Sequence, residues 1–254
     1  MNGILILDKP TGITSHDACD IVKQKLGVKK AGHAGTLDPM VTGVLVIALE
    51  DSTKALRLFN GLEKEYQGRA HVHADFDISE VEKVINNKFL GKIKQTPPKR
   101  SRVKREERER EIFDFKILDH DQRNFEFSVL CQAGTYIRKL IDDLGKEMKI
   151  AMHMASLRRT KQGPFSEEET IKVEDLNNRD KLSKSLLSLG QAVKRLDIKI
   201  VQVSDEQEKM IKQGKFIDSD LELNDEELVV AVNKDKVIAL MEKRENKLKP
   251  ERVL

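Results

Sequence analysis

Runs of apolar residues near the start of the chain have the length of buried strands. Residues 4–7 form one such run and residues 43–49 form another. Between them, apolar positions follow helical spacing over residues 18–26, with Ser15 as the predicted N-cap. Ser52 is predicted to cap a second helix directly after the later strand. The pattern therefore predicts strands with helices packed against them.

Further along the chain the apolar period changes from helical spacing to two. Residues 66–77 alternate between apolar and polar side chains, which predicts a strand with one wet face. A capping-box pattern at residues 79–82 predicts a helix after it. Residues 125–131 alternate again, Gly134 ends that strand, and residues 136–148 return to helical spacing. Side chains at this last junction are expected at the rim of a sheet.

The last quarter of the chain is predicted to be rich in short strands. A polar helix is expected after Ser166, and the pattern changes near Arg195. Two of the later strands flank a four-residue polar loop, which predicts a hairpin. We expect an α+β protein with a larger unit over residues 1–194 and a small β-rich domain over residues 195–254. The predicted strands are residues 198–203, 229–232, 237–241 and 252–254.

Composition limits the classes of protein that remain. The chain has 254 residues, of which 39% are hydrophobic and 35% charged, with a net charge of +3. This suits a globular protein, and the weak positive charge permits a polyanionic partner. Only Cys19 and Cys131 are present, which suits reduced thiols in the cytoplasm. The N-terminal apolar run is too short for a signal peptide or membrane span, so neither is expected.

A glycine-rich loop at residues 32–39 presents a single carboxylate, that of Asp38. Gly32 and Gly35 allow unusual backbone conformations and close approach of a ligand, while Pro39 prevents the loop from becoming a helix. Asp38 is therefore the candidate nucleophile. By itself, an Asp-Pro step is also typical of an ordinary turn.

A nucleophilic aspartate must stay ionised, which requires a cation close to it. Arg138 is the candidate, because it follows the second glycine-containing junction and its guanidinium suits pairing with a carboxylate. The alternative is that Arg138 is an ordinary surface residue in the first turn of a helix.

Aromatic residues are scarce, which draws attention to the two tyrosines. The chain has no Trp, and Tyr66 and Tyr136 both lie in segments already singled out. A phenol ring can stack on a nucleobase and its hydroxyl can handle a proton. Either ring could equally belong to the core.

Residues 99–111 carry seven basic and four acidic side chains, with the basic ones crowded toward the front. This pattern is typical of an arm that contacts phosphates, and equally of a solvated segment with paired charges. The candidate backbone-binding residues are Arg100, Arg102, Lys104 and Arg105.

The sequence does not favour a metal or a coenzyme. His71 and His73 share one strand face, but no further ligand falls at metal-binding spacing, so exposed strand histidines are the preferred interpretation. The glycine-rich motifs for nucleotides and the GxSxG motif are missing from the sequence. We therefore expect a reaction without a cofactor.

Five motifs in fixed order across residues 3–159 resemble those of a known enzyme family. They are Gly3–Pro10, Gly32–Pro39 followed by Thr42-Gly43, Lys64–Tyr66, Gly134–Arg138 and Leu157–Arg159. Together they resemble the TruB and dyskerin family of pseudouridine synthases. The resemblance implies a mixed, mainly antiparallel sheet with flanking helices and a central cleft, followed by a reduced PUA-like module.

The resemblance also implies roles for individual residues. Asp38 would be catalytic, attacking C1' or C6 of uridine, Tyr66 would stack on the base, and Arg138 would pair with Asp38. A uridine flipped out of an RNA stem-loop would meet His33 and Leu157. Further substrate contacts are expected from Lys9, Gly35, Thr36, Leu37, Lys64, Tyr136 and Ile137.

The family uses two substrate strategies, and features of this chain fit each. TruB-type enzymes act alone on uridine 55 in the T arm of tRNA, whereas dyskerin-like enzymes use an H/ACA guide RNA and partner proteins. Residues 95–105 resemble the dyskerin-like branch, but residues 204–228 hold nine acidic and three basic side chains, which disfavours phosphate contact there. We expect a monomeric, stand-alone tRNA enzyme. The alternatives are an H/ACA catalytic subunit and a non-catalytic RNA-binding or RNA-folding protein.

Overall fold

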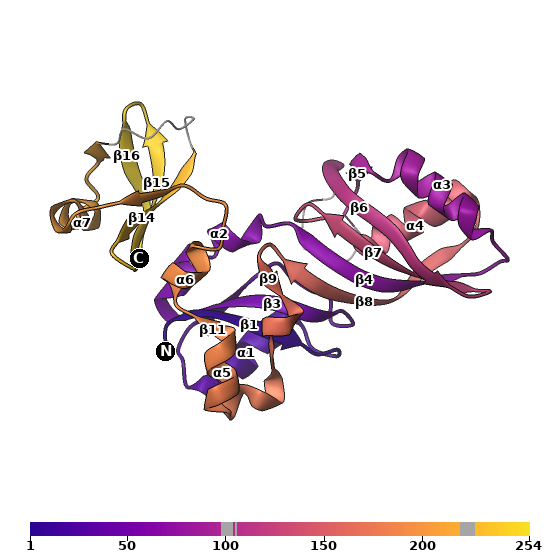
Figure 1. Ribbon diagram of the computed structural model, residues 1–254, viewed down its shortest axis with the longest axis horizontal. Helices are drawn as coiled ribbons and strands as arrows, with labels where there is room; N and C mark the ends of the chain where they lie inside the picture. The colour runs from indigo at the N-terminus through magenta and orange to yellow at the C-terminus, as the bar shows by residue number, and fades with distance from the viewer. Residues whose placement is uncertain (98–103, 105, 219–226) are drawn as a thin grey trace.

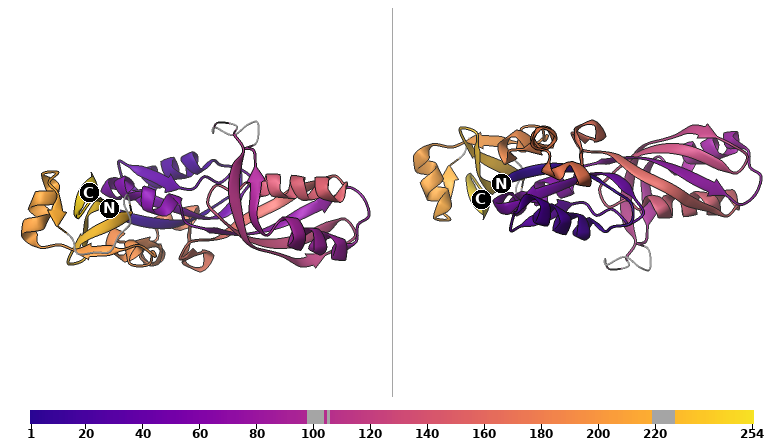
Figure 2. Two further views of the ribbon diagram at one scale, coloured as in Figure 1. Left: turned by 90° about the horizontal axis from the view of Figure 1, so that it is seen from above. Right: turned by 90° about the horizontal axis from the view of Figure 1, so that it is seen from below.

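The computed structural model describes residues 1–97, 104, 106–218 and 227–254. The molecule is elongated, with a small sheet at one end and the helices α3 (Ile78–Lys88) and α4 (Ile137–Met148) at the other (Figure 1). Seen from above and below, the long strands of a larger sheet run between these two ends (Figure 2). Among the described residues, no helix is both long and apolar enough to cross a membrane.

The larger sheet joins strands from residues 3 to 187. Its order is β10-β1-β3-β8-β4-β7-β6-β5, with β11 beside β1, β2 beside β3 and β9 beside β8. The pairs β1–β10 and β3–β8 are parallel and the other pairs are antiparallel. The prediction of a mixed, mainly antiparallel sheet is therefore confirmed. The strands are β1 (Gly3–Lys9), β2 (Ala31–Ala34), β3 (Thr42–Leu49), β4 (Lys64–Val72), β5 (Gly91–Gln95), β6 (Arg108–His120), β7 (Asn124–Cys131), β8 (Met152–Gln162), β9 (Phe165–Ser166), β10 (Ile171–Lys172) and β11 (Leu186–Leu187).

The apolar patterns place the core as predicted. The alternating residues Phe125, Phe127, Val129 and Cys131 of β7 are all buried, and they pack with the apolar face of α4 in one hydrophobic cluster. The remaining helical elements are α1 (Ser15–Leu26), η1 (Glu50–Ala55), α2 (Arg57–Asn60), η2 (Glu167–Glu169), η3 (Val173–Asn177), α5 (Arg179–Ser185), α6 (Leu189–Val193) and α7 (Asp205–Lys212).

Three of the predicted helix starts were wrong. Thr14, not Ser15, caps α1, because the Thr14 side chain accepts a hydrogen bond from the Asp17 amide and the Asp17 carboxylate bonds back to Thr14. Asp77 caps α3 ahead of the predicted capping box, and β4 ends at Val72, earlier than predicted. Ser52 lies inside η1, where its hydroxyl donates to the Asn2 side chain.

The region after Ser166 also differs from its prediction. Where one polar helix was expected, the chain forms the short elements η2, β10, η3 and α5. β10 pairs with β1, and the backbone hydrogen bonds of this pairing outweigh the local preference for a helix.

The C-terminal residues form a separate five-stranded sheet. Its order is β12-β14-β15-β16-β13, and the predicted hairpin is present as β14 and β15. Val230 and Leu240 of this sheet share a hydrophobic cluster with Ile4 and Ile6 of β1. The division at residue 194 stays a prediction. The strands are β12 (Ile200–Gln202), β13 (Ile217–Asp218), β14 (Leu228–Asn233), β15 (Lys236–Arg244) and β16 (Lys247–Val253).

Candidate active site

The loop that carries Asp38 connects β2 to β3, and hydrogen bonds to its backbone hold it in place. The Ser15 hydroxyl accepts a hydrogen bond from the Leu37 amide (2.8 Å) and donates to the Leu37 carbonyl (3.1 Å). The Gly12 amide donates to the Pro39 carbonyl (2.8 Å). Leu37 is buried, whereas the Asp38 side chain is 53% exposed. The fixed loop therefore holds one carboxylate out toward solvent.

Arg138 forms an ion pair with Asp38 across 100 residues of sequence. It lies in the first turn of α4, and its side chain is 55% exposed. A guanidinium beside a carboxylate favours the ionised form and restricts its orientation. The contact that the sequence predicted between these two residues is thus present.

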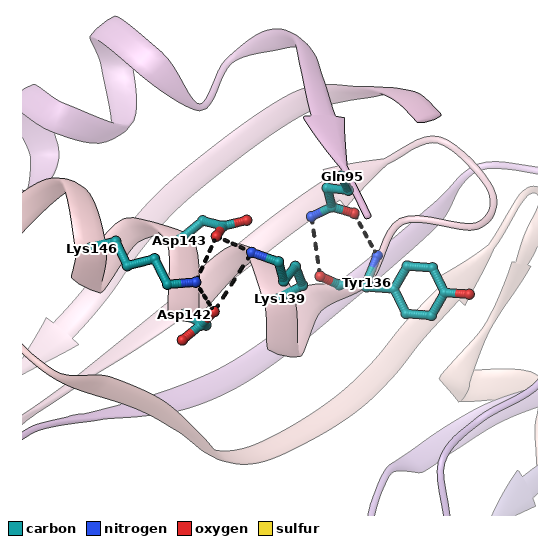
Figure 3. Close-up of polar contacts among 6 residues, drawn as sticks. All are labelled: Gln95, Tyr136, Lys139, Asp142, Asp143 and Lys146. Carbon is teal, nitrogen blue, oxygen red and sulfur yellow. Dashed lines mark hydrogen bonds and ion pairs between the residues drawn. The ribbon is translucent and has the colours of Figure 1, made fainter. Parts of the chain in front are cut away.

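The start of α4 is itself fixed by a side chain from β5. Gln95 is buried and bonds to both backbone groups of Tyr136: its Oε1 accepts from the amide (3.0 Å) and its Nε2 donates to the carbonyl (3.3 Å) (Figure 3). Further along the helix, Lys139 and Lys146 pair with Asp142 and Asp143 (Figure 3). These carboxylates are therefore already occupied on their own helix, while Arg138 pairs with Asp38.

Tyr66 lies on β4 with only 6% of its surface exposed. Burial raises the pKa of its phenol, although the Arg159 charge opposes this shift. The phenol is therefore neutral at pH 7. Leu157, directly across from Gly68 in the register of β4 and β8, is also buried.

Three buried cations surround the base of the Asp38 loop. Lys9 donates from Nζ to the carbonyls of Pro10 (2.8 Å), Ile13 (2.7 Å) and Pro39 (3.3 Å). Burial lowers the pKa of Lys9, and burial next to Arg159 lowers the pKa of Lys64 to about 8. Uncompensated burial of charge is costly, and its concentration at one loop is typical of a functional site.

His33 lies on β2, just before the loop, and is half-buried. Its Nδ1 is buried and makes no hydrogen bond within the described part of the chain. Burial and the nearby Arg159 charge lower the pKa of its imidazole, so the ring is neutral at pH 7.

Comparison with known proteins finds a family match over much of the chain. Residues 23–137 match the N-terminal domain of TruB family pseudouridylate synthases, and residues 138–194 match the C-terminal domain of tRNA pseudouridylate synthase B. A crystal structure of a Cbf5-Nop10-Gar1 complex contains a similar chain, with a TM-score of 0.87 and 32% identity, over 99% of this chain and 84% of that one. The chain belongs to the TruB and dyskerin family of pseudouridine synthases.

Other similar proteins include both named enzymes and assembled particles. A "Probable tRNA pseudouridine synthase B" of Methanopyrus kandleri is 49% identical over 178 residues, which are 70% of this chain and 52% of that protein. One of Methanococcus aeolicus is 44% identical over 177 residues, or 70% and 53%. An archaeal box H/ACA sRNP Nop10-Cbf5 complex gives a TM-score of 0.86 at 30% identity, covering 99% and 85%. The chain spans about half the length of these curated relatives.

The remaining predicted contact residues differ in their access to solvent. Thr36 is exposed, and Gly35 and Tyr136 are partly so. Lys9, Leu37, Lys64 and Ile137 are buried, with the two ammonium groups bonded to backbone carbonyls. Their roles in binding substrate stay predictions for this family member, and in this structure the two lysines instead hold backbone in place.

The predicted phosphate-binding arm falls largely outside the described residues. Arg100, Arg102 and Arg105 lie there, whereas Lys104 is exposed and pairs with Glu106. On the neighbouring strands, Lys92 pairs with Glu109 (3.0 Å). The described part of the arm thus carries paired charges.

The histidines on β4 have a third neighbour that spacing did not reveal. Nδ1 of His153, on β8, lies 2.9 Å from Nε2 of His73. His71 forms a hydrogen bond with the Asn124 side chain. Among the described residues, no group of three or more His, Cys, Asp or Glu side chains is arranged to hold a metal ion.

Four residues near the site had not been placed in the site by the sequence, and Ser15 had been predicted only as a helix cap. Ser15 and Gln95 position the Asp38 loop and the start of α4, while Arg159 and Gln162 are fully buried beneath Gly35. The one signal in the sequence was the run of five polar residues at 158–162. Only the three-dimensional pairing shows what these side chains contact.

The site is open rather than enclosed, since Asp38 and Arg138 are each more than half exposed. A pocket of about 860 Å³ lies elsewhere, where the C-terminal sheet meets the start of β1, with Asn2, Gly190 and Leu254 among its lining residues. An open carboxylate over a rigid base suits a large substrate better than a small metabolite.

Proposed function

We propose that this protein is an RNA pseudouridine synthase that isomerises uridine to pseudouridine, with Asp38 as the catalytic carboxylate. The observation that carries the proposal is the exposed Asp38–Arg138 ion pair, formed by segments 100 residues apart in a chain of this family. A uridine extruded from RNA could reach this carboxylate directly.

The reaction balances without any added group. The C1'–N1 bond breaks, the uracil turns, and a C1'–C5 bond forms while C5 loses its proton and N1 ends protonated. Asp38 acts at C1' or C6, and the ion pair with Arg138 orients its carboxylate. Tyr66 contacts the base, and its neutral phenol gives its proton to N1 and takes the proton that leaves C5, so it ends in the state in which it began.

We propose the T arm of tRNA, at uridine 55, as the substrate of a monomer that acts alone in the cytoplasm. The relatives named as probable tRNA pseudouridine synthases, at 44–49% identity, support a tRNA substrate. The second candidate is the catalytic subunit of a guide-RNA particle. It is supported by the likeness of 99% of this chain to Cbf5 bound to Nop10 and Gar1.

One experiment tests the activity and separates these candidates. The purified chain alone is incubated with a T-arm transcript containing 5-tritiated uridine, tritium release is measured, and pseudouridine is mapped. Release at uridine 55 supports the stand-alone enzyme. Release only after addition of an H/ACA guide RNA with Nop10 and Gar1 supports the particle subunit.

The Asp38→Asn variant tests the catalytic assignment in the same assay. Because Asp38 is exposed, we expect the variant to fold and bind RNA nearly as well as the original protein, but to release no tritium. Equal turnover by the variant would reject Asp38 as the catalytic group. Equal RNA binding with no release from either protein would favour a non-catalytic RNA-binding role.

A further inference from the structure

Arg159 is a buried cation without an acidic partner among the described residues. Its side chain is fully buried, and its hydrogen bonds go to backbone carbonyls. Its neighbour Arg158 is different: it is 36% exposed and pairs with Asp8 (2.9 Å) and Glu167 (2.6 Å). Burying a guanidinium without an acidic partner lowers the stability of the fold, so stability alone does not explain the position of Arg159.

Three strands and the Asp38 loop meet at Arg159. On β8 it is the register partner of Gly43 on β3 and of Tyr66 on β4. Its Nε donates to the Val44 carbonyl (2.7 Å), and its Nη2 donates to the Gly35 carbonyl (3.0 Å). A Cβ on Gly43 would stand 2.2 Å from the Arg159 carbonyl oxygen, so glycine is required for this close pairing.

The third nitrogen of the guanidinium, Nη1, lies close to Gly35 of the Asp38 loop. Nη1 is buried and makes no hydrogen bond within the described part of the chain. It lies 3.4 Å from where a Cβ of Gly35 would be. Directly opposed residues on antiparallel strands place their side chains on the same face, which puts Tyr66 beside Arg159.

We propose that Arg159 is a positioning residue for the isomerisation: it fixes the Asp38 loop, through the Gly35 carbonyl, relative to Tyr66, and places its guanidinium beside the Tyr66 side chain. This rests on the function proposed above. Burial raises the pKa of the Tyr66 phenol and the Arg159 charge opposes that rise, which supports the proposal because the charge favours the phenolate that would accept the C5 proton.

Kinetics of Arg159→Lys and Arg159→Met, with Arg158→Lys and Arg158→Met as matched controls, test the positioning. A lysine keeps the charge, but its single ammonium group cannot reproduce the two hydrogen bonds that the guanidinium makes to the Val44 and Gly35 carbonyls. We expect kcat to fall roughly 100-fold in both Arg159 variants while KM changes less than about threefold, because a small misplacement of reacting groups is costly. The Arg158 variants should keep a kcat close to that of the original protein.

The titration of Tyr66 gives a readout that does not depend on activity. Because the chain has only two tyrosines, 3-fluorotyrosine incorporated in a Tyr136→Phe background gives a single fluorine NMR signal, that of residue 66. We expect the pKa of this phenol to rise in Arg159→Met and to stay unchanged in Arg158→Met. A residue that only stabilised the fold would lower the melting temperature without moving this pKa.

The outcomes separate the two proposals. If the original protein releases no tritium, either alone or with an H/ACA guide RNA, Nop10 and Gar1, the proposed function fails. An unchanged pKa of residue 66 in folded Arg159→Met would then reject the role of Arg159 as well. If the original protein is active, a folded Arg159→Lys with the same kcat overturns the positioning role. Should Arg159→Met fail to fold, the lysine variant still decides through kcat.

Discussion

The region around Asp38 and the C-terminal sheet are built on different principles. Every buried polar or charged side chain in the described part of the chain lies between residues 9 and 185. The core of the C-terminal sheet is formed by aliphatic residues such as Val229, Ile238 and Met241, while charged pairs such as Lys212–Glu208 (2.6 Å) lie on its surface. The buried polar set is Lys9, Ser15, Ser52, Lys64, Gln95, Arg159, Thr160, Gln162 and Ser185.

Around Asp38, buried polar side chains hold the backbone in position at a cost in folding stability. A small sheet can be stabilised by apolar burial alone, and the C-terminal sheet follows that rule. Lys9, Lys64 and Arg159 instead lose hydration without an ion pair to any described carboxylate, and each holds backbone near the Asp38 loop. Changes near Asp38 should therefore affect chemistry, and changes in the C-terminal core should affect folding.

The largest effect is expected for Arg138→Ala. Loss of the ion pair frees the Asp38 carboxylate, and we expect turnover in the tritium-release assay to fall about 1000-fold, or about 4 kcal/mol in activation free energy. Because both side chains are exposed, the free energy of unfolding should change by less than about 1 kcal/mol. Lys146→Ala, which breaks exposed pairs on the same helix, is the control and should leave turnover unchanged. Unchanged kinetics in Arg138→Ala would remove its role as the partner of Asp38.

Ile238→Ala should give the opposite result. Ile238 is fully buried in the C-terminal core, and its truncation is expected to lower the free energy of unfolding by about 2–5 kcal/mol. Turnover per folded molecule should stay within about twofold of the original at a temperature well below unfolding. Chemical denaturation and the tritium-release assay measure the two quantities. A loss of turnover in fully folded protein would show that the C-terminal sheet contributes to the chemistry.

The smallest effect concerns the pH dependence of stability. The pKa of Lys64 is about 8 in the folded protein, against an ordinary value of 10.5. Between these values the unfolded chain binds the proton and the folded chain does not, so this group makes stability rise with pH, by up to about 1.4 kcal/mol per pH unit. In Lys64→Met this contribution should disappear.

The measurement is the difference in unfolding free energy between the original protein and Lys64→Met from pH 7 to 10. Taking the difference cancels the contributions of groups that do not interact with Lys64, such as Cys19, whose pKa is raised by burial to about 12. Lys88→Met, at an exposed position, is the control. A difference that stays constant over this range would contradict the buried, depressed state of Lys64.

Local sequence determined the elements in which the spacing of apolar residues defines one face to be buried. The alternation over Phe125–Cys131, the helical spacing that leads to Leu144 and the hairpin of β14 and β15 each specify which side must be buried, whatever they pack against. The Asp38 loop could be singled out because glycine permits the positive φ that Gly35 adopts and Pro39 restricts its own φ. The exact caps at Thr14 and Asp77 were missed, because neighbouring polar residues compete for the same backbone amides.

Only the tertiary structure decided which distant groups meet. Arg138 reaches Asp38 because α4 begins where Gln95 of β5 fixes its first turn, and β10 forms because β1 has a free edge. The sequence does not distinguish Arg159 from the other arginines of the chain. The strand register does, because it places Arg159 between Gly43 and Tyr66. Burial, partner and charge environment depend on contacts between segments far apart in sequence, and these are properties of the folded chain, not of local pattern.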